Sequence, residues 1–260
     1  MALFDKILPL NGANEVSKAR KTSLKFLRNM ASGLRINNAG DDASGLAVGE
    51  LLRADIATVR QSSRNVQDGI SMLQTAEGSA GQVSNILARM KQLATQASNG
   101  TYSDQQKNIM QQEFQELSEE VARIVNSTTF NGTQLHQAGQ TINIAVGDGE
   151  TISINTESMT VGSADLVNDA AGAAVTVNTA INQVSSYRGS LGAGMSRLTG
   201  TASVLDIKAE NLLAAESRIS DADTASSVAS MTAGKIMLNA AVASQAQAKT
   251  ISQVITMLLG

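Results

Sequence analysis

The chain has 260 residues, a formal net charge of −3 at pH 7, no cysteine and one histidine, His136. The length allows one large domain or two smaller ones, and the residue counts exclude disulfides, cysteine–zinc sites and sites with several histidine ligands. Aromatic residues make up 2% of the chain, so a base-stacking surface for nucleic acid is not expected. Any helical core must be built from Leu, Ile, Val, Met and Ala.

The N-terminal segment predicts a basic amphipathic helix. Residues 11–34 carry apolar side chains near one face, and residues 1–35 hold seven Lys and Arg against two acidic residues. The first apolar stretch is short and interrupted by charge, so we expect no cleaved secretory signal. No apolar run approaches the roughly 20 residues of a membrane span, so no spanning helix is expected either.

A heptad repeat predicts a long helix over residues 52–98. Apolar residues recur every seven positions from Leu52 to Ala94, and such spacing forms a stripe that packs against a partner helix. Asn99-Gly100 then ends the helix, because glycine readily adopts the left-handed conformation of a C-terminal cap.

A second helix is predicted after this turn. Ser103 or Asp104 can cap its first turn, and apolar residues follow at spacings of four and three from Met110 to Ile124. Because only about five residues join it to the preceding helix, the two helices should lie antiparallel.

The middle of the chain changes from helical to strand periodicity. Residues 126–135 (NSTTFNGTQL) break the helical pattern, and residues 141–146 and 151–154 then alternate around Gly147-Asp148-Gly149. Alternation around an Asp-Gly turn predicts a β-hairpin. An isolated hairpin is marginally stable, so this one should lie against the helices.

Two further helices are predicted in the C-terminal half. A heptad series of eight positions runs from Ala170 to Ile219, although glycines at 189–200 lower the helix propensity. Residues 224–259 are again helical in pattern and carry only two charges, Lys235 and Lys249. Because the apolar pattern continues to the last residues, this segment needs another surface to bury it, and we interpret it as an interface that many copies share.

No catalytic or metal-binding constellation stands out. We expect His136 to be a solvated loop residue, since no nucleophile or metal partner is evident in the sequence. No enzyme activity and no cofactor are therefore expected.

Residues 34–48 (LRINNAGDDASGLAV) contain two adjacent aspartates. A calcium loop needs oxygen ligands at alternate positions, so Asp41 and Asp42 do not fit one. The segment is better explained as a turn that includes Asn37, Asn38 and Gly40, after which Asp41 or Asp42 caps the next helix.

This segment also carries a resemblance to a known family. SGLRINNAGDDASGLAV resembles the N-terminal signature of bacterial flagellins, and further matching stretches follow in the family's order over residues 1–135 and 181–260. These stretches are NVQDGISMLQTAEGSAGQVSNILARMKQLATQASNGTYSD, STTFNGTQL, SYRGSLGAGMSRL and AAESRISDADTASSVASMTAGKI. The middle is short compared with flagellins that carry large outer domains.

The resemblance implies a mainly α fold, a long antiparallel helical bundle formed by both chain ends, with a small β-hairpin in the middle. It implies an inner part from residues 1–45 with 224–260, a helical rod from 46–135 with 165–223, and an outer region at 136–164. Residues 37, 38 and 40–42 would form the turn between the inner part and the rod. The expected contacts between copies are Leu24, Leu27, Leu34, Ile236, Val242, Ile251, Val254, Ile255, Leu258 and Leu259.

The implied function is that of an extracellular filament subunit used for motility. The chain would be exported unfolded through the flagellar channel and would add at the tip. Its implied partners are other copies, an export chaperone at the C-terminal helix, and the cap and hook-junction proteins. LARMKQLATQ resembles the family's contact helix for a vertebrate Toll-like receptor, which would place Arg89, Leu93 and Glu113 at that contact.

Two alternatives remain open. The related hook–filament junction protein shares the terminal helices but occupies few copies. A membrane-active amphipathic protein is the other, suggested by the basic N-terminus and the apolar C-terminus.

Overall fold

The computed structural model describes residues 2–147 and 149–259, with side chains from residue 13 onward except 248–249, 251–253 and 255–259. Asp148, in the predicted turn, lies outside the described residues. The described residues form long helices and short strands, which confirms the mainly α prediction with a central hairpin. In chain order the elements are α1 (Ala2–Ser32), α2 (Ala43–Ala97), α3 (Asp104–Ser127), β1 (Thr129–Phe130), β2 (Thr133–Gln134), β3 (Thr141–Gly147), β4 (Glu150–Asn155), α4 (Ala170–Ser220) and α5 (Thr224–Leu259).

The chain divides into two compact units. Unit 1 comprises Met1–Ile56 and Asn211–Gly260, and unit 2 comprises Ala57–Glu210. The predicted division into an inner part, a rod and an outer region concerns the layers of an assembly and stays a prediction.

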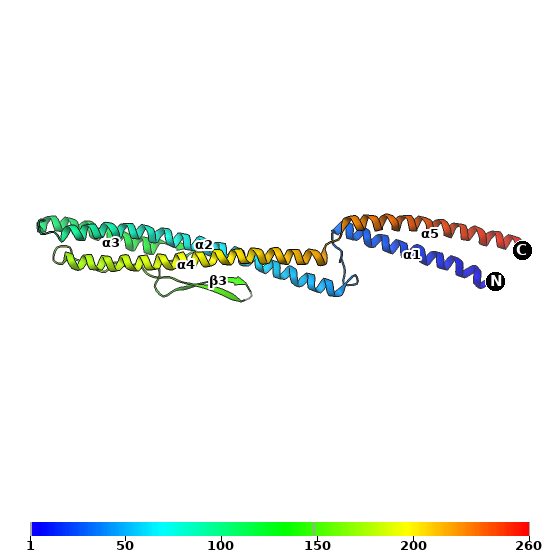
Figure 1. Cartoon of the computed structure of the whole chain (residues 1–260), viewed down its shortest axis with the longest axis horizontal. Coiled ribbons are helices and arrows are strands. Elements are labelled where there is room, and N and C mark those ends of the chain that lie inside the picture. Colours follow the sequence, from blue (N-terminus) through cyan, green and yellow to red (C-terminus); the bar gives the residue numbers. More distant parts are fainter. Residues whose placement is uncertain (1, 148, 260) are drawn as a thin grey trace. The chain divides into compact units, whose positions relative to one another are not determined.

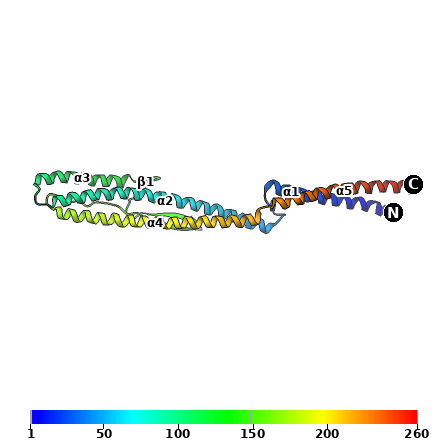
Figure 2. The ribbon, with the colours of Figure 1, turned by 45° about the horizontal axis from the view of Figure 1, so that its top comes forward.

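Unit 2 is built on three helices that lie side by side, α2, α3 and α4 (Figures 1 and 2). The predicted heptad positions form its core: Val66, Leu73, Ala80, Leu87 and Ala94 of α2 are buried, as are Val177, Val184, Leu191 and Leu198 of α4. Apolar residues at this spacing face one partner along the whole helix, so the stripe read from the sequence is the buried stripe.

The second helix of this unit, α3, begins as predicted. Ser103 is its N-cap and forms a capping box with Gln106: the Ser103 side chain accepts from the Gln106 N–H, and the Gln106 side chain accepts from the Ser103 N–H. Met110, Phe114 and Val121 face inward and are buried.

The predicted hairpin is present as β3 and β4, which pair antiparallel with Ile144 opposite Ile152. The hairpin packs on α2 and α4 beside two glycines. A β-carbon on Gly69 of α2 would collide with the Ile144 side chain, whereas one on Gly194 of α4 would lie 3.5 Å from Ile154 Cδ1, an ordinary contact distance. The close approach of the hairpin to α2 therefore depends on Gly69.

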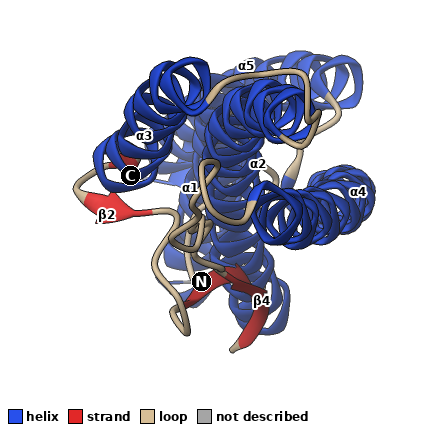
Figure 3. Ribbon diagram, turned by 90° about the vertical axis from the view of Figure 1, so that its left-hand side faces the viewer, coloured by secondary structure: helices blue, strands red, loops and turns tan. Residues whose placement is uncertain are grey.

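A second, smaller hairpin was not predicted. Strands β1 and β2 pair through Phe130 and Thr133, and Asn131 and Gly132 between them have φ values of 49° and 80°. Asn-Gly is the preferred pair for such a two-residue turn. Two-residue strands carry too little alternation for the pattern to show. Figure 3 shows strands in red beside the blue helices.

Unit 1 is dominated by the first and last helices, which lie side by side (Figure 1). α1 ends at Ser32, and Gly33 follows with a φ of 72°, the left-handed conformation common just after a helix. The helical pattern predicted for residues 224–259 coincides with α5.

Candidate functional site

The buried residues described in α1 and α5 are small or polar. Ser23 and Asn29 of α1 and Ser227 of α5 are buried. A β-carbon on Gly234 of α5 would stand 2.9 Å from Ser23 Oγ, closer than β-carbons approach other atoms. The two helices therefore come close together because little side-chain volume separates them.

Several larger apolar side chains of these helices are exposed, whereas Phe26, Met231 and Leu238 are half-buried. Five residues predicted to contact other copies are between 41% and 64% exposed: Leu24, Leu27, Ile236, Val242 and Val254. Leu34 is half-buried. The other predicted contacts lie in α5 with side chains outside the described part of the structure: Ile251, Ile255, Leu258 and Leu259. We call the exposed apolar residues of α1 and α5 the apolar surface of unit 1; it also includes Met30, Val228 and Met237, which the sequence analysis did not single out.

This apolar surface extends widely around α5. At about 100° per residue, Val242 lies about 80° and Ile236 about 200° around the helix from Gly234, which faces α1. Val254 lies on the same side as Ile236 by the same geometry. A helix that is apolar on several sides is typical of a buried position. α1 covers one side of α5, and apolar side chains on its other sides are exposed.

The loop between α1 and α2 uses its two aspartates differently. Asp42 Oδ1 accepts a hydrogen bond from the Gly45 N–H at 2.9 Å, so Asp42 caps α2. Asp41 Oδ2 accepts from the Asn37 and Asn38 N–H groups at 3.4 and 3.3 Å, and Asp41 Oδ1 pairs with Lys25 Nζ at 2.9 Å. The hydrogen bond from Lys25, with those from the backbone, holds the pKa of Asp41 below its usual range.

Two glycines, Gly40 and Gly45, lie where this loop turns and where α2 begins. The Asp41 N–H donates to the Asn38 carbonyl at 2.9 Å, which closes a turn around Gly40. A β-carbon on Gly45 would stand 2.6 Å from Ile36 Cδ1 and would also collide with the Asp42 side chain. Gly45 thus leaves room both for the cap of α2 and for the buried Ile36.

Two arginines, Arg35 after α1 and Arg53 in α2, bind the C-terminal end of α4 within unit 1. Arg35 Nη2 donates to the Ile219 carbonyl at the end of α4 at 2.7 Å, and the Arg35 N–H donates to the Ser220 carbonyl, also at 2.7 Å. Arg53 of α2 binds Glu216 Oε1 through Nε and Ser220 Oγ through Nη2, both at 2.9 Å. The start of α2 is thereby tied to the end of α4.

The residues predicted for receptor contact lie together in unit 2. Arg89 Nη2 of α2 pairs with Glu113 Oε1 of α3 at 2.7 Å, and both side chains remain about half exposed. Leu93 is 2% exposed and belongs to the core between the helices. In this arrangement the surface at this position is formed by the ion pair, while Leu93 supports the helix from inside.

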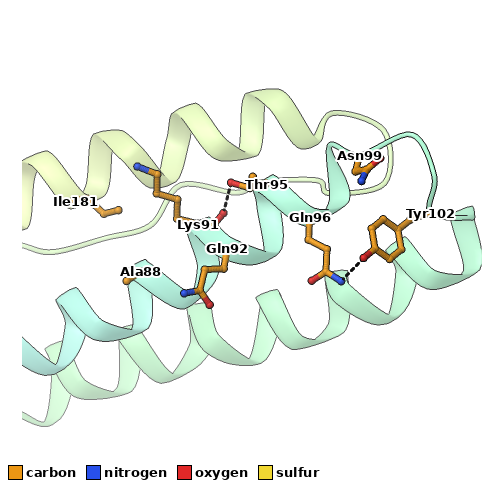
Figure 4. A pocket seen from close by; sticks show the side chains of 8 residues that line it. All are labelled: Ala88, Lys91, Gln92, Thr95, Gln96, Asn99, Tyr102 and Ile181. Carbon is orange, nitrogen blue, oxygen red and sulfur yellow. Dashed lines mark hydrogen bonds between the residues drawn. The ribbon is translucent and has the colours of Figure 1, made fainter.

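A surface cleft of about 790 Å³ lies along the same part of α2, from Ala88 to Asn99. Figure 4 shows Lys91, Gln92 and Gln96 on its wall, with Gln96 Nε2 donating to Tyr102 Oη at 3.1 Å. The cleft is open to solvent, and its polar groups are amides, the hydroxyls of Thr95 and Tyr102, and the Lys91 ammonium, which do not form a convergent catalytic set.

The prediction for His136 was wrong. Its side chain is buried at 2% exposure, with Nε2 2.5 Å from Ser79 Oγ, and its ring meets that of Tyr187 edge to face at 5.7 Å. Burial lowers the pKa of His136 to about 4. A serine and a histidine at this distance resemble a nucleophile and its base. No third group orients the ring, however, since His136 Nδ1 has no hydrogen-bond partner in the described part of the structure, so we assign the pair a structural role.

Residues 2–147 and 149–259 contain no group of three or more His, Cys, Asp and Glu side chains that could hold a metal ion. Over the same residues, no helix has both the length and the apolar composition that crossing a membrane requires.

Comparison with known proteins identifies the family. The models of the bacterial flagellin N-terminal and C-terminal helical regions match residues 6–141 and 174–259. The flagellin of Halalkalibacterium halodurans is 41% identical over 247 residues, or 90% of this chain and 91% of that protein. The flagellin of Bacillus subtilis is 35% identical over 100% of both chains. The crystal structure of Bacillus cereus flagellin superposes with a TM-score of 0.51 at 30% identity, covering 54% of this chain and 88% of that chain. This chain therefore belongs to the bacterial flagellin family.

Proposed function

We propose that copies of this chain polymerise into the helical filament of the bacterial flagellum, with the apolar surface of unit 1 as their inner contact. The observation that carries this proposal is the position of Leu24, Ile236 and Val254, large apolar side chains that are exposed, whereas the buried residues described in α1 and α5 are small or polar. Burial of such side chains is worth roughly 1.5–3 kcal/mol each, so the chain gains most from partners that cover this surface.

The form of the surface supports a polymer rather than a closed dimer. Ile236 and Val242 lie about 120° apart around α5, and with the side that faces α1 the helix directs residues of its contacts to three sides. Contacts between different surfaces of successive copies do not close on themselves and generate a helix of indefinite length. Flagellins are structural proteins, and in this proposal the chain acts by assembly and not by catalysis.

The proposal extends to the route that the chain takes. It leaves the cell unfolded through the flagellar channel without a cleaved signal peptide, and it adds at the tip beneath the cap protein, beyond the hook-junction proteins. An export chaperone covers α5 before export. In support, α5 carries only two charges and exposes Ile236, Met237 and Val242, so it needs a cover wherever it is folded and unassembled.

A second candidate function is recognition by the host's Toll-like receptor. The half-exposed pair Arg89 and Glu113 supports it, because two charged groups fixed by one another form a pre-organised polar surface. Leu93 would act only from inside the helix pair. Replacing both charged residues by alanine should abolish the receptor response of cells; an unchanged response would refute this contact.

Seeded growth tests the filament proposal. Purified chain is melted to monomer, cooled and mixed with short filament seeds, and growth is followed by electron microscopy. Ile236→Gln should slow growth strongly, because it places a polar side chain in the proposed contact. Val175→Gln is the matched control, since Val175 is 65% exposed but lies in unit 2. Equal growth by both variants would show that the inner contact lies elsewhere.

The same preparations separate the two alternatives. The hook–filament junction protein would be present at a few copies per filament, whereas the filament subunit is its bulk component, so abundance along the isolated filament distinguishes them. A membrane-active protein would bind anionic vesicles as a monomer at physiological salt and would not extend the seeds.

A further inference from the structure

His136 occupies a closed site between α2, α4 and the segment that carries it. Ser79 Oγ donates to the Ala76 carbonyl at 2.9 Å. Its single proton is then used, so it accepts from His136 Nε2–H at 2.5 Å. This leaves Nδ1 as the unprotonated nitrogen, and Nδ1 is buried without a hydrogen-bond partner in the described part of the structure.

The site is built for the neutral ring. Protonation would add a second N–H at Nδ1, which has no hydrogen-bond partner in the described part of the structure, and would leave a charge on a buried ring. Burial lowers the pKa of His136 to about 4 from an ordinary 6.5, roughly a 300-fold loss of proton affinity.

The neighbouring charges do not offset this cost. Three charged residues lie close in sequence to the residues around the ring. They are Glu77, two residues before Ser79; Arg188, next to Tyr187; and Glu157, next to Thr156. Glu77 and Arg188 pair with each other at 2.6 Å between Oε1 and Nη2, and Glu157 acts on Tyr187, whose pKa burial raises to about 12. Burial alone sets the pKa of His136.

The ring is coupled to the segment that carries the β3–β4 hairpin. Leu135, just before it, is buried and its carbonyl accepts from Tyr187 Oη at 3.0 Å. On the other side, Thr156 Oγ1 donates to the Gln137 carbonyl at 2.5 Å, and the Thr156 N–H donates to the Gln140 carbonyl at 2.8 Å. Movement of the ring out of its site would therefore disturb both ends of the hairpin.

We propose that His136 is an acid-sensitive latch, whose protonation releases residues 135–156, with the β3–β4 hairpin, from α2 and α4. In the released state the ring has its ordinary proton affinity, whereas in the packed state it remains neutral. Packing is therefore fully stable above pH 6.5, weakens as the pH falls toward 4, and changes no further below that. The equilibrium constant for release rises up to roughly 300-fold across this window.

The single histidine gives a direct test on the unmodified chain. In a proton NMR titration of the soluble monomer, the imidazole C2–H signal belongs to His136 alone. It should titrate near pH 4 in the folded chain and near 6.5 in urea. Titration near 6.5 in the folded chain would overturn the proposal.

Hydrogen exchange then tests the coupling to the hairpin. Amide protection of β3 and β4, corrected for the intrinsic pH dependence of exchange, should fall between pH 7 and pH 4.5 in the wild type and stay constant in His136→Leu. The amides of α3 serve as the internal reference and should keep their protection in both proteins. Parallel loss in wild type and His136→Leu would show that another group carries the acid response.

Discussion

Ser23 of α1 and Gly234 of α5 lie at a close approach of the terminal helices: a β-carbon on Gly234 would stand 2.9 Å from Ser23 Oγ. Ser23 Oγ is itself buried and has no hydrogen-bond partner among the described residues. Gly234 leaves room for the Ser23 side chain, and the Ser23 hydroxyl makes no hydrogen bond that would stabilise the pair. Both residues are small, and their small size permits the close packing of the two helices.

A double-mutant cycle tests this packing. Gly234→Ala should weaken the pairing of α1 and α5, because the new methyl group meets Ser23 Oγ, and Ser23→Ala should be neutral or stabilising because it removes an unpaired buried hydroxyl. The double variant should recover, with a coupling of about 1 kcal/mol between the two sites in thermal unfolding followed by circular dichroism. Strict additivity would mean that the helices are further apart.

Gly69 should tolerate no side chain. Gly69→Ala is expected to destabilise unit 2 by about 1–3 kcal/mol in urea unfolding, because the methyl group collides with Ile144 and the packed hairpin must shift. Gly78→Ala is the matched control on the same helix, since a β-carbon there meets nothing within 4 Å; it should stabilise by up to about 1 kcal/mol through helix propensity. Ile144→Val should partly rescue Gly69→Ala. A stabilising Gly69→Ala would contradict the observed packing.

The cap of α2 depends on an oxygen at Asp42. Asp42→Ala should cost about 1 kcal/mol, whereas Asp42→Asn should cost less, because the amide oxygen can still accept from the Gly45 N–H. Thermal unfolding of the two variants side by side measures the difference. Equal losses would indicate that the charge of Asp42 matters and its hydrogen bond does not.

Arg53 links two helices, so its removal should be felt more than that of an arginine within one helix. Arg53→Ala loses the bonds to Glu216 and Ser220 and also a pair with Glu50 within α2. It should cost about 1 kcal/mol, since partly exposed pairs are screened by water. Arg123→Ala loses a pair with Glu120 three residues away in α3 and should cost below about 0.5 kcal/mol. The urea midpoints of the two variants measure this difference in stability. If Arg123→Ala loses as much stability as Arg53→Ala or more, the contacts of Arg53 between α2 and α4 are not especially stabilising.

Long-range periodicity made most of the fold predictable. The heptad series from Leu52 to Ala94 became the buried stripe of α2, and the alternation around residues 147–149 became β3 and β4. These patterns repeat one physical requirement many times, so a single deviation does not hide them. The glycines of α4 did not end the helix, because packing over 51 residues outweighs about 1 kcal/mol per glycine.

Features that depend on a single contact were not predictable. His136 is buried because Ser79 and Tyr187, far away in sequence, enclose it, and nothing near position 136 indicates this. The sequence indicated that α5 is an apolar helix that needs a partner surface. It did not indicate which side of α5 faces α1, and therefore which apolar side chains remain exposed. Strands β1 and β2 were not predicted, because two residues are too few to show an alternating pattern.

Thiol protection in the filament tests the central claim most directly, because the chain has no cysteine of its own. A thiol introduced by Ile236→Cys should react with a maleimide in the monomer and be protected in the filament. A thiol introduced by Thr151→Cys, on the exposed face of the hairpin, should react in both. If the Ile236→Cys thiol reacts as fast in the filament as in the monomer, α5 does not form the contact between copies.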